Sequence, residues 1–139
     1  MDQITSCGAL LFLAILSPED IKEKQVSAKT VMIFGLLALV CRIAAGQDGM
    51  IKEMIFSLVP GMFLLILSVA SKESIGLGDG MAAVVLGLWL GGYKTFLILC
   101  IAWILAGGFA LICLLRKQKE PIPFIPFLLL GLEVLLFNA

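Results

Sequence analysis

The stretch from Thr95 to Leu115 reads TFLILCIAWILAGGFALICLL and contains no charged side chain. A helix rises about 1.5 Å per residue, so about 20 apolar residues are needed to cross the roughly 30 Å hydrocarbon core of a bilayer. This stretch meets that requirement alone. It therefore predicts a transmembrane helix in a chain that is largely surrounded by lipid. We expect its Gly107 and Gly108, together with Gly87, to permit close contact between helices.

The composition of the whole chain agrees with this interpretation. Of its 139 residues, 61% are hydrophobic and only 14% are charged, and the mean hydropathy is +1.13. Soluble domains contain about 45–50% apolar and about 25% charged residues. The apolar excess is too large for one small soluble core. The length permits a single transmembrane domain over residues 1–139.

Five further apolar segments complete the pattern. They cover roughly Ile4–Leu16, Val31–Ala45, Met54–Ala70, Met81–Gly92 and the residues after Pro121 up to Phe137. The first, second and fourth segments of the chain are short for a span, so their ends must recruit polar flanks or line a water-filled cavity. The N-terminus has no positively charged region, so we expect the first segment to remain as a span. The predicted fold class is all-α, a polytopic transmembrane helix bundle with about six spans.

The basic residues are distributed unevenly over the two sides of such a bundle. Arg42, Lys52 and Lys94 lie on one side. The other side carries the remaining seven of the ten basic residues. Because loops rich in Lys and Arg stay in the cytoplasm, we expect that side to be cytoplasmic and both termini to lie outside. The predicted location is the cell inner (plasma) membrane, with multiple passes. The basic residues on the cytoplasmic side are Lys22, Lys24, Lys29, Lys72, Arg116, Lys117 and Lys119.

Composition also excludes several classes of function. The formal net charge is zero, whereas nucleic-acid binding needs clustered Lys and Arg, so we expect no nucleic-acid partner. The absence of His excludes Ser-His-Asp and Cys-His catalysis and any His-ligated metal site. The four cysteines form no C-x-x-C pair and are interpreted as small apolar side chains. An enzyme built from this chain must use carboxylates, Cys, Lys or Tyr.

Two aspartates are expected at the cytoplasmic boundary, because Asp20 follows the first segment and Asp79 precedes the fourth. Residues 17–22 read SPEDIK, in which Ser17 would be the N-cap of a new helix and Asp20 would close a capping box. This structural role is the commoner use of such a motif. In residues 74–80, SIGLGDG, Asp79 would likewise cap the fourth helix.

Three glycines surround Asp79 at alternate positions, namely Gly76, Gly78 and Gly80. A plain turn needs fewer glycines. Because glycine has no side-chain bulk, this strip would let an extended substrate backbone approach the carboxylate, and we predict that the three glycines bind substrate. The longer G-x-G-x-x-G pattern of dinucleotide sites is not formed, because Ala83 occupies its last position.

Residues 75–79, IGLGD, followed by LGLWLG at residues 86–91, resemble the G-x-G-D motif and the following helix of the type IV prepilin peptidases. Residues 20–22, DIK, with Val26 six residues after the aspartate, resemble the first aspartate motif of that family. Residues 123–128, PFIPFL, are similar to the proline-bracketed start of its last helix. The resemblance covers most of the chain and implies a membrane aspartyl endopeptidase whose catalytic pair is Asp20 and Asp79.

Two positions depart from the family pattern. Residues 26–28 read VSA where the family often has Ile-Pro-Asn, and Met81 stands where it often has Lys. Both bear on substrate fit and activity but leave the aspartates intact. The larger members carry an N-terminal domain with paired C-x-x-C motifs, which is linked with N-methylation. That pattern is not found in this chain, so the resemblance implies cleavage and leaves methylation open.

Amide hydrolysis by such a pair needs one ionised carboxylate to take a proton from water and one protonated carboxyl to donate to the carbonyl oxygen. Two nearby carboxylates resist double ionisation and share one proton. The resemblance implies a pilin or pseudopilin precursor with a basic leader as substrate. Further expected partners are membrane lipid and, as an open alternative, a second copy in a homo-oligomer. This chemistry calls for no cofactor and no metal.

Two other interpretations stay open. Glu133 lies well within the sixth segment, where a carboxyl is costly and suggests function. Together with Arg42 at membrane depth, it would indicate a small transporter or channel subunit, although we expect Glu133 to form a structural pair with Arg42 or Lys94. The second alternative is a catalytically inactive pilus-assembly homologue, which the departures at Ser27 and Met81 would support.

Overall fold

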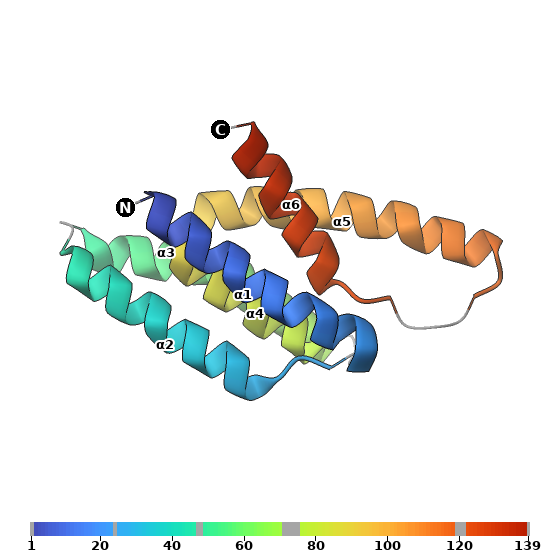
Figure 1. Ribbon diagram of the computed structural model, residues 1–139, viewed down its shortest axis with the longest axis horizontal. Coiled ribbons are helices and arrows are strands. Elements are labelled where there is room, and N and C mark those ends of the chain that lie inside the picture. Colours follow the sequence, from blue (N-terminus) through green and yellow to red (C-terminus); the bar gives the residue numbers. More distant parts are fainter. Residues whose placement is uncertain (1, 24, 47–48, 71–75, 119–121, 139) are drawn as a thin grey trace.

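The computed structural model of the chain describes residues 2–23, 25–46, 49–70, 76–118 and 122–138. These residues form six helices and no strand: α1 (Asp2–Glu23), α2 (Ala28–Ala45), α3 (Met50–Ala70), α4 (Leu77–Leu90), α5 (Gly92–Leu115) and α6 (Ile125–Phe137). Consecutive helices run in alternating directions along the bundle (Figure 1). The predicted all-α helix bundle is therefore confirmed.

The alternation gives the bundle two distinct ends. At one end α1 finishes and α2 and α4 begin (Figure 1); we name it the aspartate end, because it holds both Asp20 and Asp79. At the other end, named the opposite end, α2 and α4 finish and α3 and α5 begin. Residues that are far apart along the chain therefore meet at each end.

Among the described residues, four helices are long and apolar enough to cross a membrane: Gln3–Glu23 within α1, and α2, α3 and α5. The first two segments are thus longer than expected, because α1 continues past Leu16 through Pro18 and α2 begins at Ala28. The fourth segment is short, as expected, with 14 residues in α4. The sixth is also short, with 13 residues in α6. Each of these two helices covers only about 20 Å along its axis.

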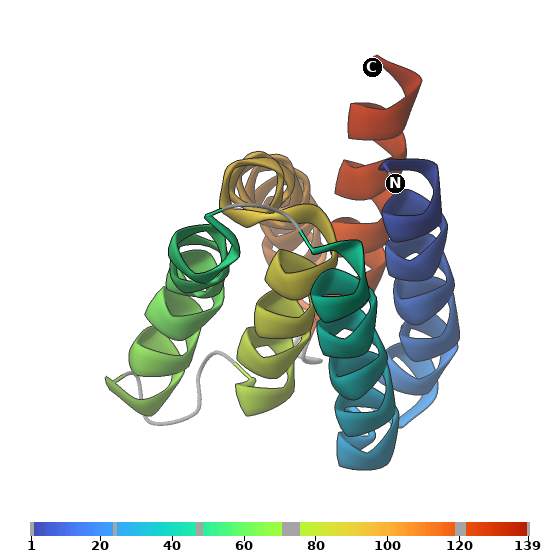
Figure 2. The same ribbon diagram turned by 90° about the vertical axis from the view of Figure 1, so that its left-hand side faces the viewer.

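Helix α4 lies at the centre of the bundle, as the view along the helices shows (Figure 2). It contacts α1, α2, α3 and α5. A helix that is apolar on all sides is stable only when it is buried, and α4 carries no charged side chain except Asp79. Burial of α4 therefore fixes the position of Asp79 in its first turn. The buried residues of α4 are Gly80, Ala82, Ala83, Val85, Leu86, Gly87 and Trp89.

The contact between α3 and α4 depends on glycines. A Cβ atom on Gly87 would overlap the carbonyl oxygen of Ser57, and one on Gly61 would overlap Val84. The expectation that Gly87 permits close helix contact is confirmed. It is wrong for Gly107 and Gly108, because a Cβ atom there would meet no atom of the described residues within 4 Å.

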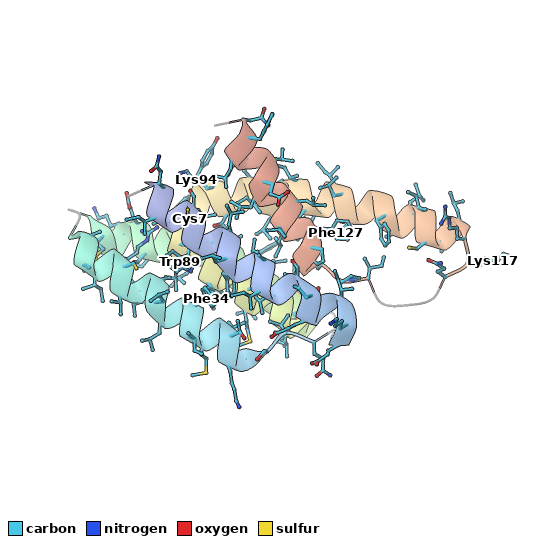
Figure 3. All side chains as sticks on the ribbon, viewed as in Figure 1. Cys7, Phe34, Trp89, Lys94, Lys117 and Phe127 are labelled. Atoms are coloured by element: carbon cyan, nitrogen blue, oxygen red, sulfur yellow. The ribbon has the colours of Figure 1, made fainter. Side chains whose placement is uncertain are left out.

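The outer surface of the bundle is apolar, as a lipid-facing surface must be. Large exposed side chains include Ile33 on α2, Ile66 on α3 and Ile104 on α5. Figure 3 shows side chains projecting outward from the part of α5 that lies nearest to Lys117. Helix α6 packs on α1 and α5, and the rings of Phe109 and Phe127 lie 5.6 Å apart between their centroids.

Candidate active site

Asp20 lies near the end of α1, and its side chain is only 5% exposed. Its Oδ2 accepts a hydrogen bond from the backbone N–H of Ile125, at 3.1 Å, and the backbone of Phe124 also hydrogen-bonds to the carboxyl. These two residues are the first residue and the N-cap of α6. The first N–H groups of a helix lack partners within the helix and favour a negative charge. The structure thus places the Asp20 carboxyl at the N-terminus of α6.

The expected capping box around Asp20 is wrong. Helix α1 runs without interruption from Asp2 to Glu23 and includes Pro18, so Ser17 is an interior residue and not an N-cap. A proline within a helix removes its own N–H donor and bends the helix without necessarily ending it. Asp20 caps a helix, but that helix is α6, which follows about a hundred positions later. No local pattern around residue 20 could reveal such a partner.

Asp79 lies in the first turn of α4, whose N-cap is Gly76. The expectation that this helix starts near Met81 is wrong, since α4 begins at Leu77. The backbone N–H of Asp79 donates to the carbonyl oxygen of Gly76 at 3.1 Å. The side chain turns back toward the same residue, and a Cβ atom on Gly76 would lie 3.3 Å from Oδ2 of Asp79. The half-buried carboxyl of Asp79 is therefore held beside an exposed stretch of backbone.

The two predicted aspartates come together. Helices α1 and α4 are in direct contact, and the negative charge of Asp20 acts directly on the Asp79 carboxyl. Like charges at short range resist simultaneous ionisation, so such a pair favours a state that holds one proton. A pair of this kind is able to activate a water molecule and to protonate a carbonyl oxygen.

The three glycines around Asp79 have different surroundings. A Cβ atom on Gly78 would lie 2.7 Å from Cβ of Val26, and one on Gly80 would lie 2.7 Å from Cδ2 of Leu65. Gly80 is buried and Gly78 is half-buried, whereas Gly76 is exposed. Close packing therefore accounts for glycine at positions 78 and 80. Substrate binding by the three glycines stays a prediction, and Gly76 is the member that is open to the surface.

Packing at Gly78 also joins the two aspartate motifs. Val26 belongs to the connection between α1 and α2, six residues after Asp20, and it packs on the backbone directly before Asp79. Sequence reasoning identified Val26 only by resemblance, and it did not identify Ile125 as a partner of Asp20. The prolines at positions 123 and 126 indicate the start of a helix, because proline is common at the first helical positions, but they do not indicate which side chain that start contacts.

The expected ion pair of Glu133 with Arg42 is wrong. Nη1 of Arg42 lies 3.7 Å from Oε2 of Glu53, and Nε of Arg42 donates to the carbonyl oxygen of Leu88 at 2.8 Å. Arg42 lies on α2, whereas α6 packs on α1 and α5, so the two side chains belong to different parts of the bundle. Glu133 is exposed on α6.

Three further acidic residues, Glu19, Glu23 and Glu73, lie close to the pair in the sequence. Glu23 is exposed and Glu19 is half-buried, while Glu73 lies outside the described residues. Within the described residues, no group of three or more Cys, Asp or Glu side chains is placed to hold a metal ion. The site is thus built around two carboxyls, one at the end of α1 and one at the start of α4.

A family model described as the type IV leader peptidase family matches residues 7–111. The match includes both aspartates and the three glycines, and it ends before α6. No curated protein and no solved structure shows significant similarity to the chain. The family implies aspartic peptidase activity of the leader-peptidase type in general, and the long apolar helices agree with a membrane protein. Because the match covers most of the chain, the protein belongs to the type IV leader peptidase family.

Proposed function

We propose that this protein removes the leader from pilin-like precursors by aspartic-type hydrolysis, with Asp20 and Asp79 as the catalytic pair. The observation that carries the proposal is the position of the two carboxyls at the end of the bundle where α1 and α4 meet, close enough for the charge of Asp20 to act on Asp79. Family membership supports the type of reaction. The pilin or pseudopilin substrate rests on the resemblance of the two aspartate motifs.

The surroundings of the two aspartates suggest different roles in the reaction. The N-terminus of α6 supports a negative charge on Asp20 through the N–H of Ile125. Asp79 faces that charge, so the shared proton is better placed on Asp79. Asp20 then takes a proton from the attacking water, while Asp79 donates its proton to the oxygen of the scissile carbonyl. Collapse of the tetrahedral intermediate breaks the C–N bond: Asp20 passes the proton taken from water to the leaving amine, and the hydroxyl formed on the carbonyl carbon gives its proton back to Asp79.

Substrate is proposed to reach the pair along the exposed backbone at Gly76. The Asp79 carboxyl lies directly beside this glycine, so an extended peptide would approach it without meeting a side chain. Gly78 and Gly80 would contribute by keeping the neighbouring elements close. The exposed Glu23 and the nearby Glu19 would attract a basic leader.

The site is proposed to lie on the cytoplasmic side of the inner membrane. Lys22 and Lys29 lie at the aspartate end, close to the end of α1 and the start of α2. Loops rich in basic residues remain in the cytoplasm. Accessibility labelling of a cysteine introduced at Lys22 tests this orientation, and labelling by a membrane-impermeant reagent from outside intact cells would contradict it.

The test of function is co-expression with a pilin precursor. Removal of the leader is detected as a change in the gel mobility of the precursor. We expect cleavage by the wild-type chain and none by Asp20→Asn or Asp79→Asn, while Glu133→Gln should cleave like the wild type. Cleavage by Asp79→Asn would overturn the proposal. If the folded wild-type chain leaves several precursors intact, the inactive-homologue alternative is favoured, because Met81 and Ser27 depart from the family pattern.

A further inference from the structure

A second cavity lies at the opposite end of the bundle, away from the two aspartates. It has a volume of about 530 Å³ and opens between the start of α1, the end of α2, the start of α3, and the junction of α4 and α5. Figure 3 shows Trp89 and Lys94 toward this end, on the same side as the N-terminus. The proposed peptidase mechanism makes no use of this cavity.

The charged lining of the cavity is predominantly positive. Arg42, Lys52 and Lys94 all line it, and Glu53 is the acid among the described lining residues. These three are the basic residues that lie on the less basic side of the bundle, so every Lys or Arg of that side converges on one cavity. Nε and Nη1 of Arg42 are held by Leu88 and Glu53. Among the residues that the structure describes, no ion pair engages Lys52 or Lys94.

The remainder of the lining is mostly apolar and aromatic. Phe56, Ile4 and Trp89 line the cavity, with Tyr93 at the start of α5. Trp89 is 4% exposed and packs against Gly8, so this part of the lining is closely packed. A cavity that combines two ammonium groups without an ion pair to the described residues and a guanidinium with apolar walls fits an amphipathic anion. A phosphate group is the chemistry that Arg and Lys recognise together.

The position of the cavity favours a lipid as the source of that phosphate. The spanning helices α2, α3 and α5 each have one end here, so the cavity lies at a membrane boundary, where headgroups are located. We propose that this cavity binds the phosphate of an anionic lipid headgroup through Arg42, Lys52 and Lys94. A bound headgroup would join the ends of α2, α3 and α5 and would stabilise the bundle at the end remote from the peptidase site.

The test measures thermal stability of the purified protein in detergent, so it does not depend on peptidase activity. Phosphatidylglycerol should raise Tm in a saturable way, whereas phosphatidylcholine should raise it little. Lys52→Gln and Lys94→Gln should each weaken the apparent affinity for phosphatidylglycerol about tenfold, as expected for loss of one charge-assisted contact. Lys29→Gln, at the aspartate end, is the matched control and should bind like the wild type.

Two further arms identify the source and the chemistry. Inorganic phosphate that stabilises the protein and competes with the lipid would support a phosphate site but overturn the lipid assignment. Lys52→Arg should retain binding, because it keeps the charge. Equal stabilisation by both lipids, or undiminished binding of phosphatidylglycerol by the Lys52→Gln/Lys94→Gln double variant, would overturn the proposal. Arg42 is not substituted in this test, because it also caps the end of α4.

Discussion

The Oδ2 atom of Asp20 lies 3.1 Å from the backbone nitrogen of Ile125, which donates a hydrogen bond to it inside the protein. Ile125 is the first residue of α6, and its side chain is fully buried. Because α6 lies beyond residues 7–111, the part that the family model matches, the first aspartate motif is completed by a helix outside that region. Helix α6 therefore has a role in the site beyond covering α1 and α5.

The first prediction removes this hydrogen bond without touching a carboxyl. Proline is well tolerated at the first position of a helix, so Ile125→Pro deletes one N–H donor where the helix does not need it. A hydrogen bond to a charged group is worth about 1.5–3 kcal/mol. We expect the cleavage rate to fall by about ten- to a hundredfold, measured as leader removal by purified protein.

The control for that variant is Ile125→Ala, which also loses the buried side chain but keeps the N–H group. It should cleave markedly faster than Ile125→Pro. Proline also disfavours the helical conformation of the preceding Phe124, so unfolding of both variants is measured as well. The destabilisation caused by Ile125→Pro should shrink in an Asp20→Asn background, because the lost bond then involves a neutral acceptor. An equal cost in both backgrounds would show that Asp20 and Ile125 are not coupled.

The second prediction concerns the charges of the proposed catalytic pair. Asp79→Asn replaces a buried carboxyl whose ionisation is opposed by burial and by the charge of Asp20, so it should abolish cleavage while leaving the free energy of unfolding unchanged or raised. Asp20→Asn should also abolish cleavage but should lower stability by about 1 kcal/mol or more, because it weakens the charge-assisted bond from Ile125. Denaturation of the two variants side by side checks this difference. Equal changes in stability would contradict the proposed division of roles.

The third prediction tests how the two aspartate motifs are held together. A methyl group at position 78 would lie 2.7 Å from both Cβ and Cγ2 of Val26, so Gly78→Ala should destabilise the protein by about 1–3 kcal/mol through overpacking and should reduce cleavage. The second substitution Val26→Ala removes the Cγ atoms and should restore part of both properties. At the exposed Gly76, the matched substitution Gly76→Ala should cost little stability. Rescue is measured as the coupling free energy of a double-mutant cycle; zero coupling would contradict the contact.

Much of the fold could be predicted because a long apolar segment is stable as a helix in lipid and not in water. The length of an apolar segment predicts whether its helix can span the bilayer. The fifth segment has no charge from Thr95 to Leu115 and is long enough, whereas the segment that forms α4 is short. Helix ends were less predictable, since polar residues continue a helix as readily as they end it. Helix α1 passes through Pro18 and still reaches Glu23, so Asp20 belongs to the first helix.

The candidate site was predictable only in part, for a related reason. The motif at residues 75–79 is continuous in sequence, so its aspartate could be identified directly. The partner of Asp20 could not, because Ile125 is separated from it by 105 positions and contributes a backbone group that has no signature in the side chain. The predicted ion pair between Glu133 and Arg42 was wrong for the same reason. The sequence does not show which helices are neighbours, and the structure places Arg42 beside Glu53.

The fourth prediction tests the close packing that positions α4. A Cβ atom on Gly87 would overlap the carbonyl oxygen of Ser57 on α3. A backbone oxygen cannot move aside as a side chain does, so Gly87→Ala should destabilise the protein by about 1–3 kcal/mol and should also impair cleavage, because α4 carries Asp79. The matched control is Gly108→Ala, where the methyl group meets no described atom within 4 Å. That control should be neutral or stabilising by up to about 1 kcal/mol, since alanine favours the helix more than glycine does. Urea or thermal unfolding in detergent compares the two variants, and equal stability of both would show that α3 and α4 are not in the close contact described for them.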